Sequence, residues 1–270
     1  MWELGAFEEV APRVWRAVNE PETVNVGLIA GDQSALVVDT GSCPAHGEAI
    51  RRVAGEVVGV PIKAAVVTHA HYDHSFGLLA FSDLATYGHE TLADAVPAQE
   101  AAMAELRLTP DDVIGPNTLF SLARSLDLGG RTVELVHFGP AHTQGDVCAI
   151  VPDADVVFAG DLLESAGPPQ FDADSSFKGW PHALDGILGT LNERSILVPG
   201  HGDPVGRDFA FEQRARIAGL YAQAQHLMQL RVPLEDALDR GDWPYDKAVI
   251  AGFLPQLYDE VARTGKVPQP

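Results

Sequence analysis

Thr68-His69-Ala70-His71-Tyr72-Asp73-His74 is a run of polar residues that directly follows the apolar letters AAVV of a predicted buried strand. Polar side chains at the end of a strand can be directed by a rigid sheet into a shared cleft. His69 and His71 are two residues apart, so in an extended chain they point to the same side. A turn at Asp73 redirects Asp73 and His74. Imidazole and carboxylate groups in this order predict two neighbouring metal positions.

Three further potential ligands follow predicted strands, each in a turn that contains glycine. His142 lies in Gly139-Pro140-Ala141-His142-Thr143, Asp161 in Phe158-Ala159-Gly160-Asp161, and His201 in Val198-Pro199-Gly200-His201-Gly202. Any one of these histidines would be weak support for a metal site. The ordered combination with the first cluster is specific.

The ordered motifs HxHxDH, H, D and H, which run from His69 to His201, resemble those of the metallo-β-lactamase superfamily. The resemblance covers nearly the whole chain and includes Val-Val-Asp-Thr-Gly at 37–41, whose Asp39 the family uses to support the site. It implies that one metal is bound by three histidines, that a second is bound by one aspartate and two histidines, and that a further aspartate bridges both. The residues implied are His69, His71 and His142 for the first metal, Asp73, His74 and His201 for the second, and Asp161 for the bridge.

The fold class that the sequence predicts is α+β, as an αββα sandwich of two mixed β-sheets flanked by helices. We expect a single domain over residues 1–270, with an insertion around 97–117 and a helical C-terminal extension from about 208. The extension shows no core of its own, so we expect it to pack on the main domain. The predicted elements are a hairpin over Val24–Ala30 and Ser34–Asp39, a helix over Pro44–Val57, strands at Ala64–Thr68, Thr132–Phe138, Val147–Val151, Val156–Ala159 and Ser195–Val198, a helix around Leu184–Leu191, and helices over Phe209–Leu230, Leu234–Asp239 and Leu254–Arg263.

The chemistry that the ligand set implies is metal-assisted hydrolysis. Two Zn²⁺ ions per chain are the expected cofactors, and iron or manganese would also suit these ligands. Zinc lowers the pKa of bound water to roughly 7, so a metal-bridging hydroxide would attack a small ester-like substrate, a thioester or lactone being favoured. Asp73 is the candidate catalytic residue, since its carboxylate could handle the proton delivered to the leaving group.

Other reactions fit the same ligands. A mononuclear iron sulfur dioxygenase on the same fold is one alternative, because imidazole and carboxylate bind iron as well as zinc. A β-lactamase-like or phosphodiester hydrolase is another, since one fold carries many functions.

The charge balance limits the partners. Subtracting 38 acidic from 18 basic residues gives a net charge of −20, with no Lys/Arg-rich stripe. We therefore expect a small-molecule substrate, and neither nucleic acid nor a membrane surface as partner. The two cysteines form no CxxC pair, and the N-terminal letters do not resemble a signal peptide, so a cytoplasmic location is expected. Nothing in the sequence indicates an oligomeric state.

The other histidines are interpreted as structural or exposed: His46, His137, His182 and His226. His89 and Glu90 are interpreted as capping and packing residues at the start of a helix. Four aromatic residues are open to either core packing or substrate contact: Tyr72, Phe171, Phe177 and Trp180.

Overall fold

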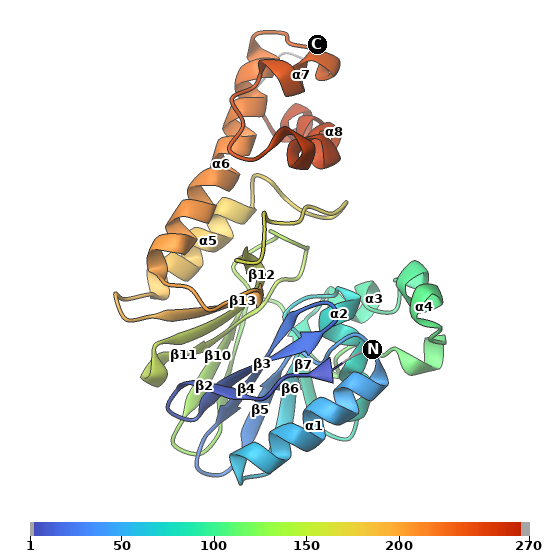
Figure 1. Ribbon diagram of the computed structural model, residues 1–270, viewed down its shortest axis with the longest axis vertical. Coiled ribbons are helices and arrows are strands. Elements are labelled where there is room, and N and C mark those ends of the chain that lie inside the picture. The colour runs from blue at the N-terminus through green and yellow to red at the C-terminus, as the bar shows by residue number, and fades with distance from the viewer. Residues whose placement is uncertain (1–2, 266–270) are drawn as a thin grey trace.

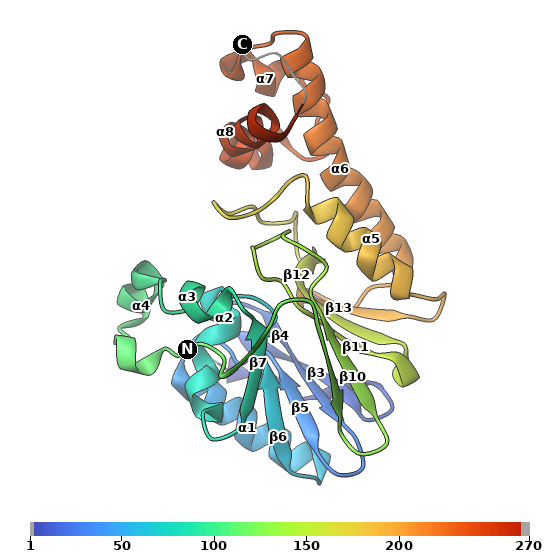
Figure 2. The ribbon, with the colours of Figure 1, turned by 180° about the vertical axis from the view of Figure 1, so that it is seen from behind.

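Two mixed β-sheets pack face to face, as Figures 1 and 2 show in the computed structural model, which describes residues 3–265. The first sheet contains β1 Glu3–Leu4, β2 Glu8–Ala11, β3 Val14–Glu20, β4 Val24–Ala30, β5 Ala35–Val38, β6 Ile62–Val66, β7 Ala85–His89 and β8 Thr118–Phe120. The second contains β9 Ala123–Asp127, β10 Thr132–Val136, β11 Cys148–Val151, β12 Val156–Glu164 and β13 Ile196–His201. Within the described residues the sheets share one paired position, His201 with Val24.

Alternation of side chains along the strands produces the layers. Leu36 and Val38 of β5 pack against Ala149 and Val151 of β11 in the space between the sheets. The intervening Val37 faces the opposite side, where it packs with the helix α1 Pro44–Val58 and the 3₁₀ helix η1 Phe76–Phe81. On the second sheet, Cys148 and Ile150 pack against the helix α5 Trp180–Thr190. The predicted αββα sandwich is confirmed.

The predicted first hairpin and helix are also confirmed. Strands β4 and β5 pair antiparallel around the turn 31–34. Helix α1 starts with Pro44 and ends at Gly59, whose φ of 67° is a left-handed conformation that favours glycine. Strand β6 then pairs parallel with β5, so this stretch is a β-α-β unit that leads directly into the ligand cluster and the short helix α2 Tyr72–Ser75.

Strands β1 to β3, at the start of the chain, are not among the predicted elements. In β3 the alternation is incomplete, because Trp15 and Arg16 are both half-buried. Short strands β7, β8 and β9 are also absent from the prediction. In β9, which lies at the edge of its sheet, polar residues such as Arg124 and Ser125 are exposed and hide the apolar pattern of a strand. Their positions come from pairing with neighbours rather than from a local pattern.

The expected insertion packs on the first sheet. It follows α3 Leu92–Ala95 and contains α4 Glu100–Leu106 and η2 Pro110–Asp112. Met103 and Val113 are buried against the helical side of the first sheet. Thr109 caps η2 in a reciprocal capping box with Asp112.

The C-terminal helices share a core cluster that also includes Phe177 of the loop before α5, so they pack on the main domain as expected, but the expectation that they show no core is wrong. They are α6 Arg207–Gln229, α7 Leu234–Arg240 and α8 Lys247–Thr264. Ala210 and Ile217 of α6 pack with α5, whereas the later residue Leu227 packs with Phe253 and Leu257 of α8 in a separate cluster. Figures 1 and 2 show α6 running alongside α5 from the sheets to α7 and α8. The separate core forms because α8 starts at Lys247, well before the predicted Leu254.

No helix within residues 3–265 is long and apolar enough to cross a membrane.

Candidate metal centre

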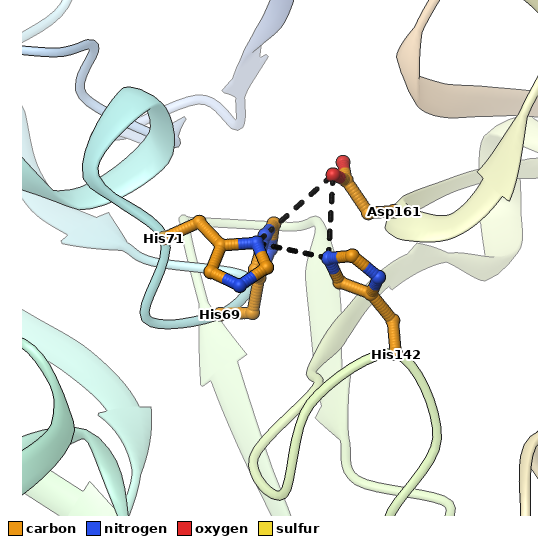
Figure 3. A group of neighbouring side chains, drawn as sticks. All are labelled: His69, His71, His142 and Asp161. Carbon is orange, nitrogen blue, oxygen red and sulfur yellow. Dashed lines mark hydrogen bonds and ion pairs between the residues drawn. The ribbon is translucent and has the colours of Figure 1, made fainter. Parts of the chain in front are cut away.

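Four of the predicted ligands converge on one point, drawn in Figure 3. His71 Nδ1 lies 3.1 Å from His69 Nε2 and 3.0 Å from His142 Nε2. Asp161 Oδ2 completes the group, 3.7 Å from His69 Nε2 and 3.5 Å from His142 Nε2. Ligands of a tetrahedral zinc at 2.0–2.1 Å are about 3.3 Å apart, so this spacing suits a metal of that size.

The other three predicted ligands form a second group beside the first. His201 Nε2 lies 3.3 Å from Asp73 Oδ2 and 3.4 Å from His74 Nε2. Asp161 reaches this group as well, with Oδ1 3.2 Å from His74 Nε2 and Oδ2 3.6 Å from His201 Nε2. Its carboxylate is therefore shared by both groups, and the structure brings all seven predicted ligands together.

The ends of strands and the turns that follow them position these side chains. His69 and His71 follow β6, Asp161 is within β12, and His201 ends β13 beside it. The close pairing of β12 with β13 requires glycine at 200, because a Cβ there would overlap Asp161 Oδ1. The Gly200-His201 dipeptide thus provides both a ligand and the space for the neighbouring carboxylate.

Hydrogen bonds on the outer side of each ring set its orientation. His74 Nδ1 donates to Asp39 Oδ2 at 2.8 Å, His142 Nδ1 to the Gln170 carbonyl at 3.1 Å, and His201 Nδ1 to the Glu22 carbonyl at 2.9 Å. These acceptors place the proton on Nδ1 and leave the Nε2 lone pair directed inward. His71 is reversed: its Nδ1 faces inward, and its Nε2 lies 3.4 Å from Asp172 Oδ2.

The electrostatics of the groups also fit a cation. Burial lowers the pKa of His142 to about 4, so its imidazole is neutral and free to bind metal at neutral pH. At His74 burial lowers the pKa, but the carboxylates of Asp161, Asp73 and Asp39 together raise it well above its ordinary value. Positive charge is therefore favoured at the second group, and a metal ion would supply it in place of a proton.

The comparisons with known proteins agree with this geometry. The family model described as "Metallo-beta-lactamase superfamily" matches residues 19–203, a span that contains all seven ligands. The chain belongs to this superfamily.

Two curated relatives illustrate activities within the superfamily. Human "Acyl-coenzyme A thioesterase MBLAC2" is 26% identical over 223 residues, which cover 69% of this chain and 76% of the relative. "Probable metallo-hydrolase YqgX" of Bacillus subtilis (strain 168) is 27% identical over 190 residues, which cover 67% of this chain and 86% of the relative. The chain is an enzyme of the hydrolase type to which these superfamily members belong.

A solved structure confirms the superfamily fold. The "Metallo-beta-lactamase from Pontibacter korlensis" superposes with a TM-score of 0.64 at 19% identity, over 80% of this chain and 99% of that one. The likeness extends to the fold and carries no information on substrate.

Asp39, which the superfamily resemblance predicts as a supporting residue, contacts two parts of the ligand cluster. It accepts hydrogen bonds from Thr68 N at 2.7 Å, Thr68 Oγ1 at 2.9 Å and His74 Nδ1 at 2.8 Å. It is buried and adopts a left-handed φ of 62°. Its carboxylate therefore fixes both the backbone before His69 and the ring of His74.

Replacing Asp39 with asparagine is expected to weaken metal binding by about 10- to 100-fold, because the amide removes the charge that orients the His74 ring. Competition with a chromogenic chelator measures the affinity. Thr68→Ser keeps the hydroxyl and serves as the control. Equal affinities of Asp39→Asn and wild type would contradict the supporting role.

The metal groups line a cavity of about 620 Å³. Of the four aromatic residues left open, Tyr72 is the one among its lining. Phe177 and Trp180 are fully buried, and Phe171 stacks on Phe177 and makes a tilted contact with Trp180. Glu164 also lines the cavity, and burial raises the pKa of its carboxyl to about 8. Sequence reasoning missed Glu164, although a glutamate in the apolar letters GDLLE is a signal that could have found it.

A loop after β12 supports the His142 segment from behind. Ser175 Oγ donates to the His142 carbonyl at 2.6 Å, and Ser176 N donates to the Ala141 carbonyl at 2.8 Å. Helix α8 in turn holds this loop, because Glu260 accepts hydrogen bonds from Phe177 N at 2.8 Å and Lys178 N at 3.2 Å. The C-terminal helices are thus connected through this loop to the backbone that presents a ligand.

His89 lies outside the metal centre. It ends strand β7 just before helix α3, where Thr91 N donates to its Nδ1 at 3.4 Å. Its ring packs in a tilted arrangement against that of His137, with centroids 4.0 Å apart, so both the capping and the packing interpretation agree with the structure. The Nδ1 atom lies 3.0 Å from Thr91 Oγ1. Burial first, and His137 second, lower the pKa of His89 below its ordinary value of 6.5.

Acid is expected to destabilise the fold partly through His89. Because its pKa is lowered in the folded state, the unfolded chain binds more protons below about pH 6.5, and the free energy of unfolding falls as the pH drops. Urea denaturation at about pH 7.5 and about pH 5.5 should show a smaller fall for His89→Gln than for wild type. An identical pH dependence in both proteins would rule out this contribution.

Proposed function

We propose that this chain is a di-zinc hydrolase that cleaves a small thioester or lactone, with thioesters favoured. One observation carries the proposal: the Asp161 carboxylate is shared by two adjoining groups of ligands, 3.2 Å from His74 and 3.5 Å from His142. These seven side chains are of the kinds that bind zinc in catalytic sites, and two zinc ions held by them would activate water for hydrolysis. The similarity to a relative named as an acyl-coenzyme A thioesterase supports the choice of a thioester.

Zn²⁺ ions held by these seven residues would supply Lewis-acid polarisation of the carbonyl and a lowered pKa for water. In the overall reaction the oxygen of water forms a bond to the acyl carbon, the carbon–sulfur bond breaks, and a proton passes to the leaving sulfur. The cavity that the metal groups line contains Tyr72, Asp73 and Gln170, which would surround the reacting bond.

Asp73 is the residue that we propose to carry the proton. Its side chain lines the cavity and lies 3.3 Å from His201 Nε2, so one oxygen faces the ligands and the carboxylate still borders the substrate space. Asp73→Asn is expected to lower kcat by about 10²-fold or more, because general acid–base catalysis contributes roughly that factor. A variant that keeps full turnover together with full metal occupancy would contradict this role.

Elemental analysis of the freshly purified protein tests the metal content. We expect about two zinc atoms per chain, with thioester hydrolysis that is lost on treatment with a chelator and restored by zinc. One iron atom and no second metal would instead favour the sulfur dioxygenase. A protein that retains no metal even after reconstitution would overturn the proposal.

A further inference from the structure

A second cavity of about 470 Å³ adjoins the metal cavity. The two cavities share the lining residues Glu164, Gly167 and Pro168, so they lie against the same short segment after β12. Its start is fixed, because Ser165 Oγ donates to the Asp203 carbonyl at 2.8 Å. The second cavity therefore lies next to the space where the metal groups would hold the reacting bond.

Apolar groups from three parts of the chain make up somewhat more than half of the surface of the second cavity. Pro168 comes from the shared segment, Phe209 from helix α6, and Tyr245 and Val249 from the start of α8 and the turn before it. The volume lies within the range of about 300–1,000 Å³ typical of small-molecule sites. The C-terminal helices thus form one wall of a space next to the metal groups.

The charges of the second cavity disfavour an anionic occupant. Of the described residues that line it, only Arg216 carries a positive charge, and this guanidinium is already ion-paired with Glu212 and lies 5.9 Å from the centre of the Tyr245 ring. Glu164 and Asp246 add two further carboxyl groups. A carboxylate or phosphate would meet these acids without an available cation.

We propose that this second cavity binds the acyl arm of the substrate and that the arm is apolar and uncharged. The inference rests on the proposed function and specifies its substrate class: a thioester with a medium-length unbranched acyl chain. Such a chain would displace water from Pro168, Phe209 and Val249. Each methylene group that is buried would lower the dissociation constant by up to about fourfold.

Gly167 offers a substitution that tests the site without disturbing the fold. A Cβ at Gly167 meets no heavy atom within 4 Å, and the residue lines both cavities. Gly167→Leu should therefore fold and place its side chain at the junction. Gly252 on α8 is exposed and equally unobstructed, and it lines neither cavity, so Gly252→Leu is the matched control.

The first measurement compares kcat/KM for S-octanoyl- and S-acetyl-N-acetylcysteamine, two neutral thioesters that differ only in the acyl arm. We expect the octanoyl-to-acetyl ratio to be at least about 10 in wild type and Gly252→Leu, and to fall at least about tenfold in Gly167→Leu. A ratio near one in wild type, or a ratio that Gly167→Leu leaves unchanged, would overturn the proposal.

Direct binding separates this inference from the proposed function. The probe is 2-decanone, an uncharged ketone with an octyl arm that cannot be hydrolysed, titrated by NMR into the zinc-loaded protein. Binding at least about tenfold weaker in Gly167→Leu than in Gly252→Leu would support the site even if no thioester is cleaved. Equal binding by the two variants, or tighter binding of decanoate or decyltrimethylammonium than of 2-decanone by wild type, would overturn it.

Discussion

Replacing Asp161 with asparagine is expected to lower the rate of thioester hydrolysis by about 10³-fold, because metal-ion catalysis is worth several kcal/mol and this residue serves both metal positions. The amide keeps the shape of the side chain but removes the charge between His74 and His142. We also expect less metal per chain than in wild type. Single-turnover kinetics and elemental analysis of the same preparation provide the two readouts.

The control for this variant is Asp111→Asn, which changes an exposed carboxylate outside the metal cavity. It is expected to keep the metal content and the rate of wild type. If Asp161→Asn retained both, the shared carboxylate would have no part in the metal centre, and the proposal that depends on it would be wrong.

Replacing Glu260 with alanine is expected to lower the free energy of unfolding by about 3–5 kcal/mol. The glutamate is buried and accepts hydrogen bonds from Ser176 Oγ, Phe177 N and Lys178 N, which an alanine would leave without their acceptor. In a chain of this size the loss corresponds to a fall in Tm of roughly 10 °C. Denaturant titration and thermal unfolding measure the two quantities.

Zinc affinity shows whether Glu260 supports the metal centre or only the stability of the whole fold. The loop that Glu260 holds also contacts the His142 carbonyl, so we expect Glu260→Ala to weaken zinc binding at temperatures where the protein is fully folded. Asp259→Ala, an exposed neighbour on α8, should change stability by no more than about 0.5 kcal/mol. A Glu260→Ala protein as stable as this control would contradict the expected contribution.

The sequence predicted the layers and the ligand cluster because each depends on local patterns. Apolar β-branched runs such as Val24–Ala30 produce buried strands, and the polar residues that follow β6 mark the edge where ligands collect. The order of the histidines and aspartates then corresponds to the superfamily pattern over residues 19–203. Every residue predicted as a metal ligand lies in one of the two adjoining groups.

The features that the sequence did not predict depend on long-range contacts. The acceptors for His142 and His201 are backbone carbonyls of Gln170 and Glu22, and a carbonyl has no signature in the sequence. The core among α6, α7 and α8 forms only when Leu227 meets Phe253, far along the chain. Glu164 follows two leucines at the end of β12, and its place beside His201 is set only when β12 pairs with β13.

The narrow junction between the two sheets has a consequence for how the protein opens. Among residues 3–265 the sheets share one paired position, His201 with Val24. The segment 69–74 follows the first sheet, and Asp161 and His201 belong to the second. A metal ion that binds both segments would act as a cross-link between halves that are distant in the chain. Loaded protein would then exchange its amide hydrogens in both sheets through one common opening, whereas metal-free protein would open each sheet at its own rate.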